Sequence, residues 1–232
     1  MPRRTSEDRK DQILDAVQRV FAESGFHATT TKHLAEAAGV SEALLFKYFP
    51  TKERLYSEML TRVCAHCAKD REQWLQLPPN TATLAILVHH VVKNLAGGPR
   101  PDDTGSHLKV QNNRLMLQSL LADGAFARKF LSLMSTSVVD ALARCLIAAA
   151  KGGDCDSAPG SLAEARVRSW SALHVAMSAM MYRLPEVPAI DYQVSDRQLI
   201  PRMVRFSLRG LGLSQAAIDR CYQPDAMAVA GT

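Results

Sequence analysis

The feature that most constrains this chain is a run of short helices, each with its own capping residue, between residues 29 and 56. Hydroxyl side chains suited to N-capping recur at Thr29–Thr31, at Ser41 and at Thr51. Gly39 ends the second helix of the chain, and Pro50 ends a third helix that we expect over Glu42–Phe49. A helix this short is unstable alone and must be held by its neighbours. Two short helices separated by one glycine are typical of a helix-turn-helix.

A longer first helix precedes this run. Its apolar residues repeat at helical spacing and form one stripe: Ile13, Ala16, Val17, Val20 and Phe21. Gly25 follows, and we expect it to end the helix as a C′ residue in the left-handed conformation.

Beyond residue 56 the pattern changes to long helices. We expect the fourth helix to run to about residue 76, and further helices near 80–95, 106–122, 124–151, 161–184 and 195–211. Strand-like alternation is limited to a few residues. The sequence therefore predicts an all-α protein, with an N-terminal three-helix helix-turn-helix domain over 1–56 and a larger helical domain over 57–232.

The amino-acid composition is compatible with an all-helical fold, but it does not indicate which molecule the protein binds. Of the 232 residues, 47% are hydrophobic and only 6% aromatic, a mix that favours helices and supplies a sizeable core. The formal charge is +5, but residues 1–56 hold nine Lys or Arg against eight Asp or Glu, which leaves +1 there. An argument for DNA must therefore come from where individual residues sit.

The chain ends and the cysteines point to a reducing compartment. The start is polar and basic, no secretory signal follows, and five cysteines are irregularly spaced. No uninterrupted apolar stretch reaches the ~18 residues needed to cross a bilayer. We expect a cytoplasmic protein with no membrane partner.

The third helix offers one face to solvent if Leu45 faces inward with Phe49. At about 100° per residue, Ala43 and Lys47 then point away from the core. Lys47 is suited to guanine O6/N7 or to a phosphate, and Ala43 to a thymine methyl group. Glu42 would repel phosphate unless it accepts from a cytosine amine.

Other polar groups near this face are suited to binding DNA phosphates, which would fix the register of the protein on the duplex. The whole predicted DNA-binding set is Thr29, Thr30, Thr31, Lys32, Ser41, Glu42, Ala43, Leu44, Lys47, Tyr48 and Lys52. Basic residues at the N-terminus are placed to reach flanking backbone or minor groove: Arg3, Arg4, Arg9 and Lys10.

These residues also match a family pattern. The run Gly25-Phe26-x-x-Thr29-Thr30-x-x-x-Leu34-Ala35-x-x-Ala38-Gly39-Val40-Ser41-x-x-x-Leu45-Phe46-x-Tyr48-Phe49-x-x-Lys52-Glu53-x-Leu55 resembles the signature of the tetracycline-repressor (TetR) family, over about residues 9–58. The resemblance implies a repressor that binds double-stranded operator DNA as a homodimer. It also implies a small, apolar inducer in the C-terminal domain, and a dimer interface built from the last two long helices, near 161–184 and 195–211.

Two residues depart from the family pattern. Leu44 stands where threonine is common and has no group that forms a hydrogen bond. Phe46 stands where most members have tyrosine, so a hydroxyl often used on phosphate is missing. An operator sequence borrowed from relatives therefore does not transfer to this chain.

Cys64 and Cys67 form a C-x-x-C with His66 inside it, on one face of the fourth helix. They offer an alternative function as a redox or metal sensor, but a closed zinc site needs four ligands and no second pair is present in the sequence. Buried structural cysteine is the simpler interpretation. His89 and His90 are adjacent, so they project about 100° apart and chelate poorly.

Methionines in the C-terminal half suggest where a ligand would bind. Methionine adapts to irregular shapes and suits an apolar pocket, although such a stripe is more often plain core or dimer seam. The candidate pocket residues are Met116, Met134, Trp170, His174 and Met177. We find no catalytic constellation, metal site or cofactor loop, so we expect no enzyme; a helical enzyme or carrier using the C-terminal cavity is the remaining alternative.

Overall fold

The computed structural model describes residues 6–69, 76–97 and 104–225, with side chains left out for 66–69 and 104–109. Over these residues every regular element is a helix, and the single β-type pairing is an isolated bridge between Cys155 and Leu213. The all-α prediction is confirmed. The chain forms two compact units, of which unit 1 holds residues 1–70 and 100–131, and unit 2 holds 71–99 and 132–232.

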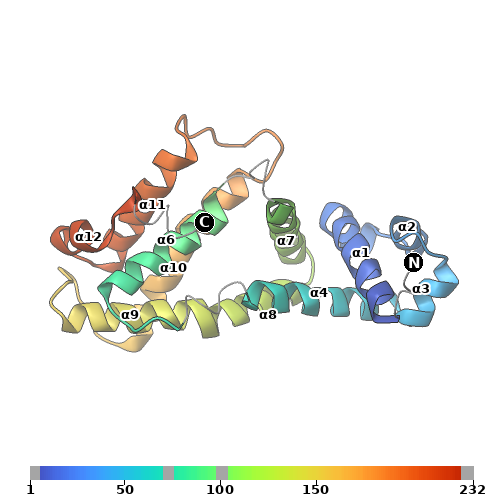
Figure 1. Ribbon diagram of the computed structural model, residues 1–232, viewed down its shortest axis with the longest axis horizontal. Coiled ribbons are helices and arrows are strands. Elements are labelled where there is room, and N and C mark those ends of the chain that lie inside the picture. Colours follow the sequence, from blue (N-terminus) through green and yellow to red (C-terminus); the bar gives the residue numbers. More distant parts are fainter. Residues whose placement is uncertain (1–5, 70–75, 98–103, 226–232) are drawn as a thin grey trace. The chain divides into compact units, whose positions relative to one another are not determined.

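Unit 1 is built around α1. Its helices are α1 (Ser6–Ala28), α2 (Thr31–Ala37), α3 (Glu42–Tyr48), α4 (Lys52–Lys69), α7 (Thr104–Leu121) and most of α8 (Ala125–Met134). Helix α1 packs on α2, α4 and α7, and α2 packs on α3 (Figure 1). The predicted stripe faces inward: Ile13, Val17 and Phe21 are fully buried, as are Leu34 of α2 and Leu55 and Met59 of α4.

The predicted caps are present. Thr30 Oγ1 accepts from the backbone N of His33 at 3.2 Å, and Ser41 Oγ accepts from that of Leu44 at 3.1 Å. Thr51 Oγ1 accepts from the backbone N of Arg54 at 3.1 Å, at the start of α4. These bonds satisfy helix N–H groups that have no partner inside the helix, and so fix where α2, α3 and α4 begin.

Gly25 departs from our prediction. It does not end α1 in the left-handed conformation; its φ of 74° and ψ of 170° make a kink, after which the helix resumes to Ala28. The Gln118 side chain of α7 lies against this kink, 3.2 Å from where a β-carbon on Gly25 would stand. The positive φ is the physical reason for the glycine, and the Gln118 side chain leaves little room for a β-carbon.

The other helices of unit 2 pack around α6 (Thr81–Ala96). The helix packs on α9 (Asp140–Lys151), α10 (Leu162–Tyr182), α11 (Asp196–Leu211) and α12 (Gln215–Cys221) (Figure 1). Because α6 is apolar on most of its circumference, it is suited to a central position. The ranges predicted from the sequence for α6, α7, α10 and α11 agree with these bounds within two residues at each end. Helix α12 was not predicted.

The predicted helix over 124–151 is continuous but not uniform. A π-helical turn at Ser135–Val139 separates α8 from α9. Ser137 Oγ donates to the carbonyl of Leu133 at 2.6 Å within this stretch. By length and composition, residues 125–151 would suffice to cross a membrane, but Val139, Leu142 and Leu146 are fully buried in the protein, as in a core helix.

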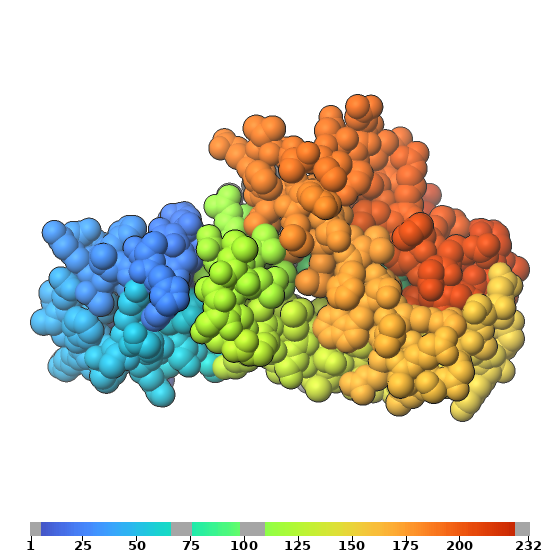
Figure 2. Space-filling model, turned by 180° about the vertical axis from the view of Figure 1, so that it is seen from behind, coloured from blue at the N-terminus to red at the C-terminus, as the bar shows by residue number. Residues whose placement is uncertain are grey.

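The loop after α9 is held by ion pairs and hydrogen bonds to the C-terminal helices. Asp154 Oδ2 accepts from Thr81 Oγ1, and its Oδ1 accepts from Arg220, both at 2.5 Å. The Arg168 guanidinium donates to the Ser157 carbonyl at 2.6 Å. Figure 2 shows this loop in gold beside the red end of the chain. The two hydrogen bonds from Thr81 and Arg220 lower the pKa of Asp154.

The compact units do not divide where we expected the domains to divide. Unit 1 extends past residue 56 through α4 and also includes α7. Helix α4 is described to Lys69, and residues 70–75, over which we expected it to continue, lie outside the described residues. The division into a DNA-binding part over 1–56 and a ligand-binding part over 57–232 stays a prediction.

Candidate nucleic-acid interface

Helix α3 is anchored by two residues and leaves the rest of its surface open. Leu45 and Phe49 are 2% and 1% exposed. Ala43 and Lys47, on the opposite side of the helix, are exposed, and the Phe46 ring is 41% exposed. The inward direction predicted for Leu45 is therefore correct, and α3 presents the outward face that the sequence predicted.

The first residue of α3 is tied to α2. Thr31 Oγ1 donates to Glu42 Oε2 at 2.8 Å, across the turn that contains Gly39. This bond orients the carboxylate and uses one of its two oxygens. The other oxygen stays available to a donor outside the protein, such as an amine on a base edge.

Two basic residues near α3, Lys10 and Lys52, contact other residues of unit 1. Lys10 Nζ lies 2.6 Å from Glu58 Oε2 and 5.5 Å from the Phe49 ring centroid. Lys52 Nζ lies 4.4 Å from the Phe26 ring centroid. The hydrogen bond from Lys10 is the main cause of a lowered pKa at Glu58. These contacts brace α1 against α3 and α4 and take cations away from the solvent face.

The predicted DNA-binding residues fall into three groups by exposure. Thr30, Lys32, Ser41, Glu42, Ala43 and Lys47 are exposed, and Thr31, Leu44, Tyr48 and Lys52 are half-buried.

Thr29 forms the third group alone. It is 2% exposed, and its Oγ1 donates to the Gly25 carbonyl at 2.7 Å. Its hydroxyl ties the end of α1 to the start of α2, so we leave it out of the DNA-facing set proposed below. Arg3 and Arg4 lie outside the described residues.

The predicted ligand-pocket residues are divided between the two compact units, and a shared pocket stays a prediction. Met116 belongs to unit 1, whereas Met134 and the α10 residues belong to unit 2, and both methionines are buried as core residues. On α10, the rings of Trp170 and His174 stack with centroids 5.9 Å apart. Met177 is half-buried on the same helix.

The other sequence signals have structural explanations. Cys64 is 3% exposed, and the side chains of His66 and Cys67 lie outside the described residues. No group of three or more potential metal ligands occurs among the side chains that the structure describes. His89 Nδ1 lies 3.0 Å from Tyr222 Oη, as expected for a satisfied core histidine, and burial raises the pKa of Tyr222 to about 12.

Comparisons with known proteins agree with this geometry. Residues 13–59 match the family model described as "Bacterial regulatory proteins, tetR family". The HTH-type transcriptional regulator RutR of Escherichia coli is 44% identical over 55 residues, which are 24% of this chain and 26% of RutR. The nucleoid occlusion factor SlmA of Haemophilus ducreyi is 34% identical over 64 residues, 27% of this chain and 32% of SlmA. The chain thus aligns with about a third or less of the length of the curated relatives it matches.

Solved structures share the fold over most of the chain. AibR, in complex with isovaleryl coenzyme A and operator DNA, superposes with a TM-score of 0.63 at 15% identity, covering 85% of this chain and 97% of AibR. The TetR family regulator PfmR of Thermus thermophilus gives a TM-score of 0.60 at 16% identity, covering 88% of this chain and 99% of PfmR. At these identities the likeness shows the fold alone.

Proposed function

We propose that this chain, whose residues 13–59 match the TetR family model, is a transcriptional regulator of that family that binds operator DNA with α3 in the major groove. The observation that carries the proposal is the capped α2–α3 pair, in which Leu45 is buried while Ala43 and Lys47 are exposed on the opposite face. A helix-turn-helix uses this face, and above all its N-terminal part, to contact base edges.

Each exposed residue has a defined role in the proposal. Lys47 donates to guanine or to phosphate, and Ala43 contacts a thymine methyl group. Glu42, oriented by Thr31, accepts from a cytosine amine. Lys32 contributes a phosphate contact that fixes the register.

Selecting duplexes from a random pool tests this function. We expect a palindromic site whose half-sites are separated by about one helical turn, ~34–36 Å, or by a multiple of it. Enrichment of no sequence by the purified full chain, under conditions in which it is folded, would refute a sequence-specific DNA-binding role.

We propose that α10 and α11 form the dimer interface. Exposed residues of α10 follow a heptad-like spacing along one stripe: Val167, Ser171, His174, Ser178 and Met181. On α11, which packs against α10, Phe206 is 67% exposed. Large apolar side chains exposed together on a helix pair mark a surface that another molecule covers. Trp170 and His174 belong in this proposal to the seam rather than to a ligand pocket.

Replacing Phe206 by Glu tests the interface. A buried, unpaired carboxylate at each of two symmetry-related positions opposes association, so we expect F206E to sediment as a monomer at concentrations where the parent chain is a dimer. Exposed Arg202, one turn earlier on α11, gives the control R202E at a position where a charge is already present. A dimeric F206E would place the interface elsewhere.

We propose further that a small molecule modulates DNA binding. AibR was solved with a coenzyme A thioester and operator DNA, and a FadR of Bacillus subtilis with stearoyl-CoA. The competing redox function has less support, because Cys64 is buried and oxidation favours accessible thiolates. Reversible loss of operator binding on mild oxidation, absent in Cys64→Ser, would favour the redox alternative.

A further inference from the structure

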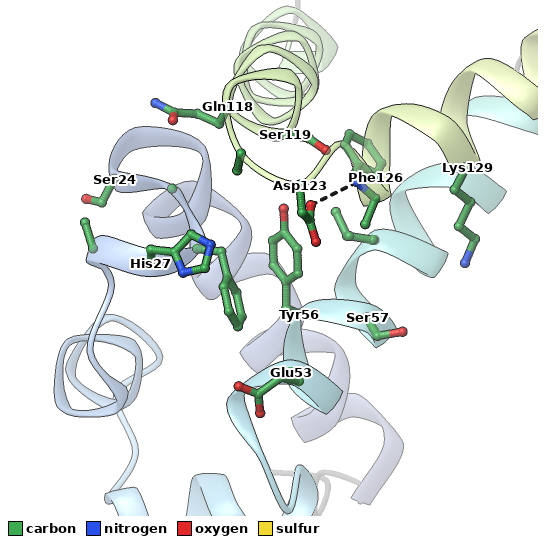
Figure 3. Close-up of a pocket in the computed structure, with 16 residues that line it drawn as sticks. Ser24, His27, Glu53, Tyr56, Ser57, Gln118, Ser119, Asp123, Phe126 and Lys129 are labelled. Atoms are coloured by element: carbon green, nitrogen blue, oxygen red, sulfur yellow. Dashed lines mark hydrogen bonds between the residues drawn. The ribbon is translucent and has the colours of Figure 1, made fainter.

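Unit 1 contains a cavity of about 460 Å³ that lies outside the predicted pocket residues. It lies among the end of α1, the first half of α4, the end of α7 and the start of α8, all within the same unit (Figure 3). Its apolar wall is formed by Phe26, Tyr56, Leu60 and Phe126. The volume is in the range of small-molecule sites, and the aromatic rings of Phe26, Tyr56 and Phe126 supply part of the lining.

The end of the cavity near α8 carries a fixed negative charge. Asp123 Oδ1 accepts from the backbone N of Ala125 at 2.9 Å, which holds the carboxylate at the turn between α7 and α8. Figure 3 shows the Tyr56 hydroxyl pointing toward this end. Burial and the nearby charge of Asp123 raise the pKa of Tyr56. The phenol therefore stays neutral, and the carboxylate is the charge a ligand meets.

Positive groups around the cavity are directed to other partners. Lys129 Nζ donates to Thr61 Oγ1 at 2.7 Å, and Arg128 donates to the backbone carbonyl of Asp123 at 2.8 Å. Glu53, on the opposite side of the opening, is an exposed second carboxylate. Lys129 and Arg128 keep their charge, but these hydrogen bonds occupy N–H donors of both, and the carboxylates of Asp123 and Glu53 are the anionic groups at the cavity.

One ring of the aromatic wall already contacts a cation, the ammonium of Lys52, which does not line the cavity. Lys52 Nζ lies 4.4 Å from the centroid of Phe26, and Phe26 in turn packs on Tyr56 with centroids 4.9 Å apart. A ring face that holds an ammonium shows the electrostatic preference expected of the aromatic quadrupole. A ligand with a cationic head and a flat apolar body would satisfy both the carboxylate and the rings.

We propose that this cavity binds an organic monocation with an aromatic body, whose charged nitrogen lies at Asp123 and whose rings pack on Tyr56 and Phe126. Tyr56 Oη accepts a hydrogen bond from the same nitrogen, because the hydroxyl makes no hydrogen bond with any residue the structure describes.

A ligand bound in this cavity would change the position of the helices proposed to bind DNA. The cavity is bounded by Gly25 of α1 and by Gln118 of α7, whose side chain lies against Gly25. A ligand that enters between them shifts α1, on which α2 and α4 pack. This regulatory consequence rests on the proposed DNA-binding function, whereas the binding site itself does not.

The test uses three probes that share one indole ring and differ in charge: tryptamine, the neutral alcohol tryptophol, and indole-3-acetate. Binding is measured by calorimetry on the full chain without DNA, so failure here leaves the DNA-binding proposal untouched. A partly exposed ion pair together with a cation–π contact predicts that tryptamine binds about five- to tenfold more tightly than tryptophol. Indole-3-acetate should bind most weakly.

Asp123→Asn removes the charge and keeps a side-chain oxygen for the Ala125 N–H, so α8 stays capped. We expect D123N to lose most of the preference for tryptamine over tryptophol, while Glu186→Gln, on an exposed loop of unit 2, keeps the preference. Tyr56→Phe should weaken tryptamine about threefold and leave tryptophol's affinity closer to that of the parent chain. Tighter binding of the acetate, no preference in the parent chain, or an unchanged preference in D123N would each overturn the proposal.

Discussion

Gly25→Ala is the substitution whose effect can be worked out most fully from the structure. With φ at 74° and ψ at 170°, Gly25 occupies a backbone region that is essentially reserved for glycine, where another residue costs about 1–3 kcal/mol. The added β-carbon would stand 3.2 Å from Gln118 Oε1, the end of a flexible side chain that can retreat at small further cost. We therefore expect G25A to destabilise unit 1 by about 2–3 kcal/mol, most of it from the backbone.

The control is Gly39→Ala. Gly39 also has a positive φ, 63°, but nothing lies within 4 Å of its β-carbon position. We expect it to cost about 1–2 kcal/mol, the usual penalty of a left-handed residue. Urea unfolding followed by circular dichroism gives the loss, and hydrogen exchange of α1 amides assigns it to unit 1.

A double variant separates the two causes in Gly25→Ala. Adding Gln118→Ala removes the steric part and leaves the backbone part, so the destabilisation by G25A should fall by less than about 1 kcal/mol in that background. If G25A costs less than about 0.5 kcal/mol in either background, the kink at residue 25 does not have the conformation described above, and the reasoning fails.

Two further predictions concern the interface and unit 2. Lys47→Ala should weaken binding to the selected operator by about 1–3 kcal/mol if Lys47 contacts a base, as measured by fluorescence anisotropy, and an unchanged affinity would exclude that role. Burial, and next the charge of Lys93, lower the pKa of His89, so the unfolded chain binds this proton more readily. Stability should therefore fall as pH drops below about 6.5 toward the lower folded value, and His89→Gln, which keeps a partner for Tyr222, should flatten this part of the pH profile.

The helix-turn-helix was predictable because its determinants are local. Capping hydroxyls act within three residues, and each of Thr30, Ser41 and Thr51 bonds the backbone N–H predicted by its position. The buried side of α3 followed from the spacing of Leu45 and Phe49 on one short helix. The same reasoning gave most of the helix bounds in unit 2, where the capping serine or asparagine is adjacent to the apolar repeat.

The features that the sequence did not predict depend on contacts between distant segments. Gly25 was interpreted as a helix end, whereas its positive φ makes a kink at the place where Gln118 of α7, far along the chain, lies against α1. Helix α12 is short and was hidden in a stretch without a long apolar repeat; its Tyr222 is recognisable as core only once His89 is beside it. The cavity of unit 1 combines residues from four helices and has no motif of its own.

The charge distribution of unit 1 leads to a last prediction, on the salt dependence of DNA binding. Among the described residues of the helix-turn-helix, Lys10 and Lys52 are held by Glu58 and by the Phe26 ring, while Lys32 and Lys47 are exposed and have no such contact. Two available lysines per protomer give four in a dimer, and log K should fall with log salt at a slope of about −3.6. A slope steeper than about −6 would show that further cations, such as Arg3, Arg4 and Arg9, also neutralise phosphates, and would contradict an interface limited to these two lysines. Repeating the measurement with Lys32→Ala should reduce the slope by about two units for the dimer, because one phosphate contact is lost from each protomer.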